Sequence, residues 1–233
     1  MDIRALLAGL LFALIWSSAF SSMRIIVEAA PPITALSIRF LLSGLIGVGI
    51  ARAMGQGMGL TRPQWRAVIV FGICQNALYL GLNFVAIQWI EASLAAIIAS
   101  TMPLLVAAAT WGLFRERLSA LGLAGLAAGF FGVALIMVQR LGGGADALGV
   151  VLCLIGAMAL TAATLMVRGA SSGGGSLMMI VGLQMLVGAA VLAPIAVLTE
   201  TWSVDWSVKL VLAFFYTTLM PGLLATLIWF WLV

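Results

Sequence analysis

The sequence predicts an all-α polytopic membrane protein, and three observations support this fold class. Hydrophobic residues make up 64% of the 233 residues and charged residues only 8%, whereas about a quarter of a soluble domain is charged. The mean hydropathy is +1.25. Apolar segments of about 20 residues, the length that crosses a hydrocarbon core of ~30 Å, recur along the whole chain. These properties exclude a soluble domain and a basic face for nucleic acid.

Turn-forming residues divide the chain into segments that each match one membrane-spanning helix. The clearest breaks are Pro31-Pro32, Gly55 to Gly59, Gly142 to Gly144 and Ser171 to Gly175. These glycine runs lack the strand and Lys-Ser/Thr context of a phosphate loop, so we interpret them as turns. The first segment exceeds the roughly 7–15-residue core of a signal peptide, so we expect it to remain as a helix. The expected helices are residues 3–27, 33–54, 64–88, 92–114, 119–138, 147–168, 176–198 and 208–232.

The charged residues orient the predicted helices in a cell inner (plasma) membrane, with the N-terminus in the cytoplasm. In this orientation the cytoplasmic ends hold more basic residues than the outer ends, as the positive-inside rule requires. The acids show the opposite bias, and tryptophans at segment ends suit the membrane interface. The cytoplasmic basic residues are Arg4, Arg52, Arg62, Arg66, Arg115, Arg117 and Arg168, and the outer ones are Arg24, Arg140 and Lys209.

A weak internal repeat divides the chain near residue 144. A shift of 145 residues places Arg39-Phe40-Leu41 on Gln184-Met185-Leu186, and residues 82–85 on residues 227–230. We therefore expect a first repeat of five helices over residues 1–144 and a second repeat over residues 145–233. Because five is odd, the second copy enters the membrane from the opposite side, the inverted arrangement of many secondary transporters.

The second repeat holds only three of the five expected helices. In the register of the repeat, Val233 falls opposite Gln88, and the chain ends on an apolar run without a charged tail. We expect two further helices, about 50 residues, to be absent from this sequence. A protein with eight helices is the alternative.

A polar stripe runs along the third predicted helix. Gln75, Asn76, Tyr79 and Asn83 recur at three-, four- and seven-residue spacings, so they share one helical face. An unpartnered amide in hydrocarbon costs several kcal/mol, so the stripe must face other helices or a cavity. We expect it to line a substrate cavity, with interhelical hydrogen bonding as the alternative. In the register of the repeat, the four stripe residues fall opposite Met220, Pro221, Leu224 and Ile228, whose side chains carry no amide or hydroxyl. This predicts a substrate cavity with one polar wall and one apolar wall.

Short motifs in several helices carry a family resemblance that spans the chain. They are Trp16 to Phe20, Arg39-Phe40, Met102 to Leu104, and Phe114 to Leu118 before a Gly-rich helix. As a set they resemble the drug/metabolite transporter (DMT) superfamily, in particular its EamA-type members. This resemblance implies ten helices in two inverted five-helix repeats. The run Cys74 to Tyr79 is most similar to the YddG-type amino-acid exporters, which implies outward movement of neutral or aromatic amino acids through a central cavity.

Three further residues are candidates for contact with a solute. Trp16 lies halfway along the first helix, too deep for an interfacial belt, and Ser17 follows it. An indole ring and a hydroxyl could bind an amphipathic solute, although packing explains them equally well. Arg39 is the charged residue that lies inside a predicted span. Because a charge within the membrane is costly, we expect Arg39 to have a functional role. It could hold a carboxylate bidentately, or it could extend its side chain to the interface.

Two prolines and a run of glycines predict departures from regular packing. Pro103 and Pro221 fall inside the fourth and eighth helices, where they remove backbone bonds and could serve as hinges for alternating access. A tolerated kink is the alternative. The fifth helix contains Gly122, Gly125, Gly129 and Gly132, which predict a face that packs closely against another helix of the bundle, with dimerisation as the alternative.

The residues that are absent also bear on function. The chain has no His, and no Asp or Glu lies inside a predicted span, so no proton relay, metal site or cofactor site is expected. We therefore expect facilitated diffusion or exchange of a small molecule across the lipid bilayer, with coupling through the two absent helices as the alternative. A channel or a structural membrane subunit is the alternative. An enzyme is not expected, because it would need a nucleophile and base or a metal at depth. The oligomeric state stays open.

Overall fold

The computed structural model describes residues 3–115, 118–166 and 177–232, and the predicted helix ends at 167–168 and 176 lie outside them. This part of the chain contains no strand and has eight helical spans that are long and apolar enough to cross a membrane. The predicted all-α polytopic fold is therefore confirmed. The spans are Ile3–Ala29, Pro32–Ala53, Arg62–Ala86, Ala92–Phe114, Ala120–Arg140, Ala147–Met166, Leu177–Thr199 and Val208–Trp229.

Three of the spans change their helix type or break along their length. The third and eighth spans each contain a π-helical segment, and the fourth breaks into two α-helices near its middle. The elements are α1 (Ile3–Ala29), α2 (Pro32–Ala53), α3 (Arg62–Val70), η1 (Phe71–Leu80), α4 (Gly81–Ala86), α5 (Ala92–Ala99), α6 (Met102–Phe114), α7 (Ala120–Gly142), α8 (Ala147–Met166), α9 (Leu177–Thr199), α10 (Val208–Thr217), η2 (Thr218–Leu224) and α11 (Ala225–Leu232).

Local sequence explains where several of these helices begin. Pro32 opens α2, where a missing N–H costs no helical bond. The Gln64 side-chain oxygen accepts a hydrogen bond from the Thr61 N–H at 2.9 Å, which closes half of a capping box before α3. Ser207 Oγ accepts from the Leu210 N–H at 3.1 Å at the start of α10. Pro103 occupies the first turn of α6 and so accompanies the break after α5.

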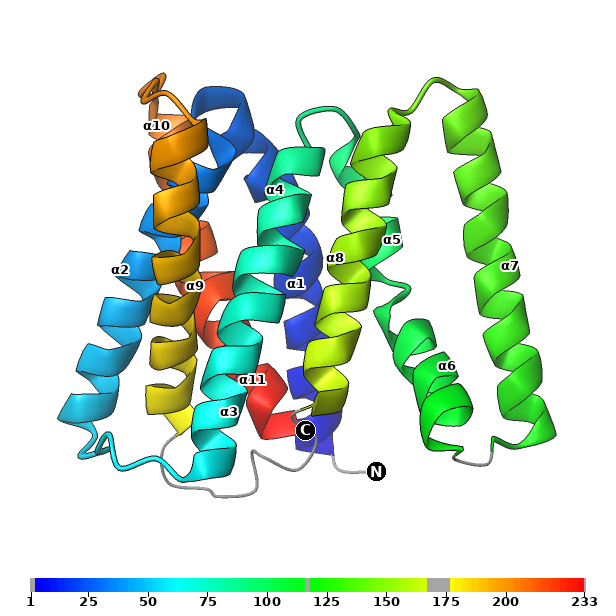
Figure 1. Cartoon of the computed structure of the whole chain (residues 1–233), viewed down its shortest axis with the longest axis horizontal. Coiled ribbons are helices and arrows are strands. Elements are labelled where there is room, and N and C mark those ends of the chain that lie inside the picture. Colours follow the sequence, from blue (N-terminus) through cyan, green and yellow to red (C-terminus); the bar gives the residue numbers. More distant parts are fainter. Residues whose placement is uncertain (1–2, 116–117, 167–176, 233) are drawn as a thin grey trace.

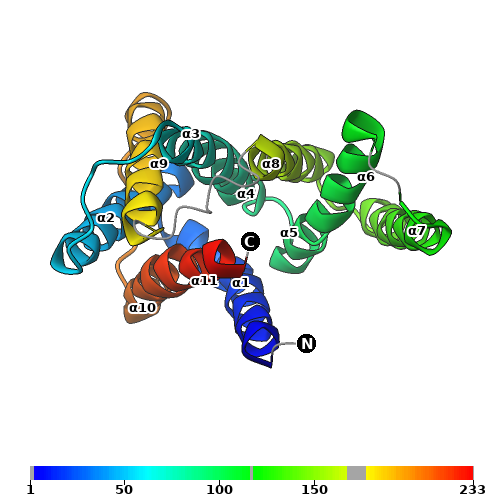
Figure 2. The ribbon, with the colours of Figure 1, turned by 90° about the horizontal axis from the view of Figure 1, so that it is seen from below.

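The helices stand side by side as a bundle, with the chain termini at one end and most of the short connections divided between the two ends (Figure 1). We call the end that carries the termini the termini side and the opposite end the far side. Viewed along the bundle, α2 and α9 occupy one edge and α7 the other, with η1, α8, α1 and α11 between them (Figure 2). The most apolar stretch of α7 has no buried residue, whereas α2 and α9 each bury half or more of theirs.

Glycines bring α2 and α9 into backbone contact. A Cβ placed on Gly182 would lie 2.7 Å from the backbone nitrogen of Val48, and one on Gly47 would lie 2.9 Å from the Cα of Gly182. A similar approach joins η1 to α9, because a Cβ on Gly188 would lie 2.6 Å from the Cβ of Asn76. Small residues allow membrane helices to approach closely. These contacts hold the polar stripe of η1 inside the bundle.

Candidate functional site

A central cavity of about 380 Å³ lies between α1, η1, the α5–α6 break, α8 and α11. Phe12 and Trp229 belong to the parts of α1 and α11 that are closer to the termini side, so the cavity reaches toward that end. Its volume falls within the range of roughly 300–1,000 Å³ that is usual for small-molecule sites. The lining residues are Phe12, Ala13, Trp16, Ser17, Phe20, Gln75, Tyr79, Ala96, Ala99, Ser100, Met102, Pro103, Leu160, Thr226 and Trp229.

Four aromatic rings form a connected wall of this cavity. The ring centroids of Phe12 and Trp16 are 5.2 Å apart, and those of Phe12 and Trp229 are 5.5 Å apart, with tilted planes in both pairs. The rings of Trp16 and Tyr79 are nearly parallel, at 10°, with centroids 6.4 Å apart. These separations are typical of interacting aromatic pairs. Because the rings come from α1, η1 and α11, the wall depends on three helices that are far apart in the sequence.

Gln75 is the polar group of the cavity with unused hydrogen-bonding capacity. Its side chain makes no hydrogen bond to another described residue, although it is only 5% exposed. The hydroxyls of Ser17, Ser100 and Thr226 donate to backbone carbonyls three or four residues earlier in their own spans, at 3.1, 2.7 and 2.8 Å. Their oxygens keep lone pairs that can accept. The cavity thus offers an amide that can donate and accept, and hydroxyl oxygens that can accept.

A second, smaller cavity of about 30 Å³ adjoins the first. The two share five lining residues: Trp16, Phe20, Gln75, Tyr79 and Thr226. The smaller cavity is lined in addition by Arg39 and Asn76. The Arg39 side chain is 4% exposed, and its Cζ lies 4.7 Å from the centroid of the Phe40 ring and 5.6 Å from that of Phe84. A cation on aromatic faces is favourable, yet none of the described carboxylates forms an ion pair with Arg39.

The structure brings most of the predicted site residues to these two cavities. Trp16, Ser17, Gln75, Tyr79 and the predicted hinge Pro103 line the larger cavity, and Arg39, Asn76 and the predicted hinge Pro221 line the smaller one. Asn83 lines neither. Its Nδ2 donates to the Tyr79 carbonyl at 2.8 Å, and its Oδ1 accepts from Cys153 Sγ at 3.3 Å. Asn83 therefore joins the third span to α8, the interhelical role that was its alternative.

The polar stripe lies on a π-helix, which the sequence analysis did not anticipate. Gln75, Asn76 and Tyr79 all belong to η1, and Pro221 belongs to η2. Short π-helical segments occur often at functional sites. Pro221 gives a sequence signal for an irregularity in η2, because its ring removes a backbone donor. Residues 71–80 contain no proline, so η1 has no comparable signal.

Several lining residues were missed by sequence reasoning. Phe12 lies one helical turn before Trp16, so an i, i+4 search from that tryptophan would have found it. Trp229 is near the end of the chain, where it resembles an interfacial anchor. Ser100 and Thr226 come from segments without a polar stripe. Their role depends on how α5 and α11 pack against α1, which no local pattern specifies.

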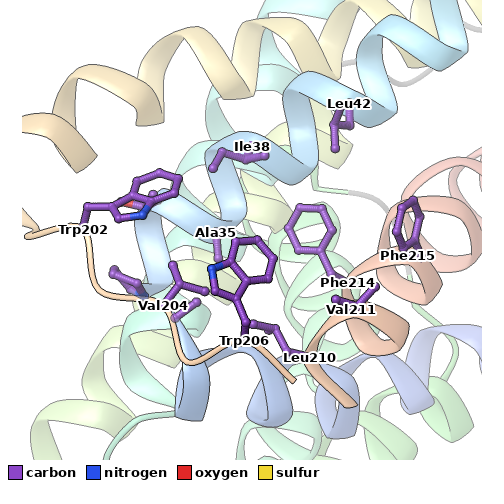
Figure 3. Close-up of a pocket in the computed structure, with 13 residues that line it drawn as sticks. Ala35, Ile38, Leu42, Trp202, Val204, Trp206, Leu210, Val211, Phe214 and Phe215 are labelled. Atoms are coloured by element: carbon purple, nitrogen blue, oxygen red, sulfur yellow. The ribbon is translucent and has the colours of Figure 1, made fainter. Parts of the chain in front are cut away.

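A separate groove of about 300 Å³ lies between α2, α10 and the segment before α10. Trp202 and Trp206 flank it together with Phe214 and Phe215, and Ile38 lies on its α2 side (Figure 3). The two tryptophans are 68% and 75% exposed at the far side of the bundle. Nearly all of its lining is apolar, so it lacks the polar groups that orient a solute. We therefore assign the functional site to the central cavity.

Comparisons with known proteins agree with this arrangement. The chain is 27% identical to YvbV of Bacillus subtilis (strain 168), an uncharacterized transporter, over 88% of this chain and 67% of YvbV. It is 31% identical to YedA of Escherichia coli (strain K12), an uncharacterized inner membrane transporter, over 65% of this chain and 50% of YedA. It is 27% identical to an S-adenosylmethionine/S-adenosylhomocysteine transporter of Chlamydia trachomatis serovar D, over 58% of this chain and 40% of that protein.

A solved crystal structure has the same fold. It superposes with a TM-score of 0.69 over 99% of this chain and 79% of its own length, at 22% sequence identity. The chain thus spans between two fifths and two thirds of the relatives named above. The family model of EamA-like transporters matches residues 3–138, more than half of the chain. This protein belongs to the EamA-like transporter family.

Proposed function

We propose that this protein is a secondary transporter that exports small amphipathic metabolites, with neutral or aromatic amino acids as its substrates. The observation that carries the proposal is the central cavity, in which an aromatic wall from Phe12, Trp16 and Trp229 faces the amide of Gln75. Rings bind the apolar part of a solute, and the amide and hydroxyl oxygens bind its polar end. The similarity of Cys74 to Tyr79 to the YddG-type exporters supports amino acids as the solute class.

Alternating access between two inverted repeats is the proposed mechanism. The repeat register supports it: adding 145 to residues 71–80 gives 216–225, a range that contains η2, Thr218–Leu224. Both proposed repeats, 1–144 and 145–233, then carry a π-helical segment at the same place beside the cavity. Helices with altered hydrogen bonding at the midplane can bend between two states. Pro103 and Pro221, which line the larger and the smaller cavity, would act as hinges.

Transport would proceed down a gradient, by facilitated diffusion or exchange. The chain has no His, and the described acidic residues lie at or beyond the ends of the spans, which supports transport without a proton relay in these eight spans. With the N-terminus in the cytoplasm, the cavity of this structure reaches toward the cytoplasmic side. A solute from the cell could bind in this state, which is the state that begins an export cycle when the solute is more concentrated inside.

A larger metabolite that carries both a ring and a cation is the second candidate. The named S-adenosylmethionine/S-adenosylhomocysteine transporter favours it, and so do the aromatic rings of the cavity. A sulfonium, like a quaternary ammonium, is attracted to aromatic faces. This candidate predicts that S-adenosylmethionine competes with the best amino acid for transport.

Uptake into proteoliposomes that contain the purified protein tests the proposal. We expect saturable uptake of one or more neutral or aromatic amino acids that is unchanged when the pH gradient is collapsed. Flux that rises linearly with substrate concentration would favour a channel. Uptake that is abolished when the pH gradient is collapsed would contradict facilitated diffusion. The second candidate would be favoured if no amino acid is transported and S-adenosylmethionine displaces a bound amino acid from the purified protein.

A further inference from the structure

Arg39 is a buried cation without an anionic partner. Its Nε atom is inaccessible and makes no hydrogen bond, and no hydrogen bond or ion pair joins its guanidinium to any described residue. The cost of burying an uncompensated charge is several kcal/mol even after relaxation. The rings of Phe40 and Phe84 offset part of this cost but leave the hydrogen-bond donors unused. A buried group of this kind requires an explanation.

Among the described residues, no carboxylate forms an ion pair with Arg39. The described ion pairs, Arg24 with Glu28 and Arg140 with Glu91, lie at the far side of the bundle. Glu200 accepts hydrogen bonds from the start of α2 instead, through Ile33 and Thr34. The guanidinium of Arg39 is therefore left without an anionic partner among the described residues.

The smaller cavity places the guanidinium within reach of a solute in the larger one. Arg39, Gln75 and Asn76 line its walls, and Gln75 also lines the larger cavity. A volume of about 30 Å³ has room for the oxygens of a small anionic group, since one water needs about 10–15 Å³. A guanidinium pairs with a carboxylate through two parallel hydrogen bonds, the strongest fit available to either group.

We propose that Arg39 binds the carboxylate of the transported solute and thereby restricts transport to solutes that carry one. This inference rests on the proposed function, because it places the solute in the central cavity. The carboxylate occupies the smaller cavity beside Arg39, the Gln75 amide contacts the polar atoms next to it, and the apolar group lies against Phe12, Trp16 and Trp229. Solutes in which the carboxylate is replaced by an amide would leave the guanidinium buried and unpaired.

Matched pairs of acids and amides test this assignment. The probes are L-phenylalanine, L-tryptophan and L-leucine, each compared with its amide, as competitors of uptake in proteoliposomes and as ligands in thermal unfolding of the purified protein. We expect the wild type to prefer the acid by about tenfold or more, since sites built around a hydrogen-bonded group reject analogues that lack it. Arg39→Gln should reduce this preference to less than about twofold, by raising KM for the acid.

Two further variants separate binding from folding. Arg39→Lys keeps the charge but loses the bidentate geometry, so it should retain a preference for acids with a weaker KM. Arg52→Gln makes the same substitution at an exposed position of α2 and should leave the preference unchanged. Because Arg39 is uncompensated without solute, Arg39→Gln should unfold at the same temperature as the wild type or a higher one. The acid should raise the Tm of the wild type and not that of Arg39→Gln.

The outcomes distinguish this inference from the proposed function. If uptake is saturable but shows no preference for acids over amides, or if Arg39→Gln shows the same preference as the wild type, Arg39 does not bind the carboxylate. The proposed transport function would still hold. A lower Tm of Arg39→Gln with an unchanged preference shows a structural arginine. Uptake that collapses when chloride is replaced by methanesulfonate assigns the site to an inorganic anion and also overturns the inference. Acid-specific thermal shifts without any flux support the site and count against the transporter.

Discussion

The indole ring of Trp16 and the phenol ring of Tyr79 lie nearly parallel, with an interplanar angle of 10° and a centroid separation of 6.4 Å. Trp16 belongs to α1 and Tyr79 to the π-helix η1, so this pair joins two spans at the cavity. Tyr79 is 1% exposed, and Trp16 is only partly buried. The pair therefore presents the indole, rather than the phenol, as the accessible ring for a solute.

Trp16→Ala should lower kcat/KM for an aromatic amino acid by about 10- to 100-fold. The loss of one ring contact and its buried area is worth about 1.4–2.8 kcal/mol, and each 1.4 kcal/mol is a factor of ten. Trp16→Phe should retain most of the activity. Trp111→Ala, on the exposed surface of α6, is the control and should leave uptake unchanged. Equal uptake by Trp16→Ala and the wild type, at equal protein abundance, would remove Trp16 from the site.

Glu200→Ala should destabilise the protein by about 1–2 kcal/mol, because Glu200 caps a helix that is far away in the sequence. Its carboxylate accepts hydrogen bonds from the N–H groups of Ile33 and Thr34, at 2.8 and 2.7 Å, and from the Thr34 hydroxyl at 2.7 Å. Thermal unfolding in detergent measures the effect. Glu28→Ala removes an exposed i, i+4 pair and should cost at most about 0.5 kcal/mol. A smaller loss for Glu200→Ala than for Glu28→Ala would contradict the capping role.

Gly188→Ala should destabilise the protein by about 1–3 kcal/mol, the usual cost of an overpacked interior. The added Cβ would lie 2.6 Å from the Cβ of Asn76, so η1 and α9 would have to separate. Gly132→Ala is the matched control in α7, since its Cβ would meet nothing within 4 Å. It should be neutral or stabilising by up to about 1 kcal/mol, because Ala favours a helix over Gly. Fluorescence-detected unfolding of the two variants decides between these expectations.

Composition and periodicity were sufficient to predict the eight spans, because each span requires a long apolar run and each loop a breaker. Packing was less predictable. The sequence predicts a close-packed face at Gly122, Gly125, Gly129 and Gly132. In the structure a Cβ on Gly129 would lie 2.8 Å from Cδ1 of Leu104 in α6, whereas one on Gly125 or Gly132 would meet nothing within 4 Å. Other close contacts between helices occur at Gly47, Gly182 and Gly188. A glycine pattern shows that close approach is possible, while the partner helix depends on the whole bundle.

The polar stripe was informative about the site for a similar reason. Amides cannot face hydrocarbon, so their inward orientation follows from the sequence alone. Whether an inward amide lines a cavity or bonds a neighbouring helix depends on tertiary contacts. Gln75 has no partner and lines both cavities, Asn76 donates to the Gln184 carbonyl at 2.9 Å, and Asn83 bonds Tyr79 and Cys153. Trp229 lacked a signal because a tryptophan near the end of a span is typical of the membrane interface.

Counterflow in proteoliposomes tests the central claim most directly. Vesicles loaded with a high concentration of unlabelled L-phenylalanine or L-tryptophan are diluted into a trace of the same labelled amino acid, and internal label is followed with time. A carrier that alternates access at the central cavity predicts transient accumulation of label above the outside concentration, and Trp16→Ala should reduce it by about tenfold or more. Label that only equilibrates, at the same rate in wild type, Trp16→Ala and protein-free vesicles, would contradict the account.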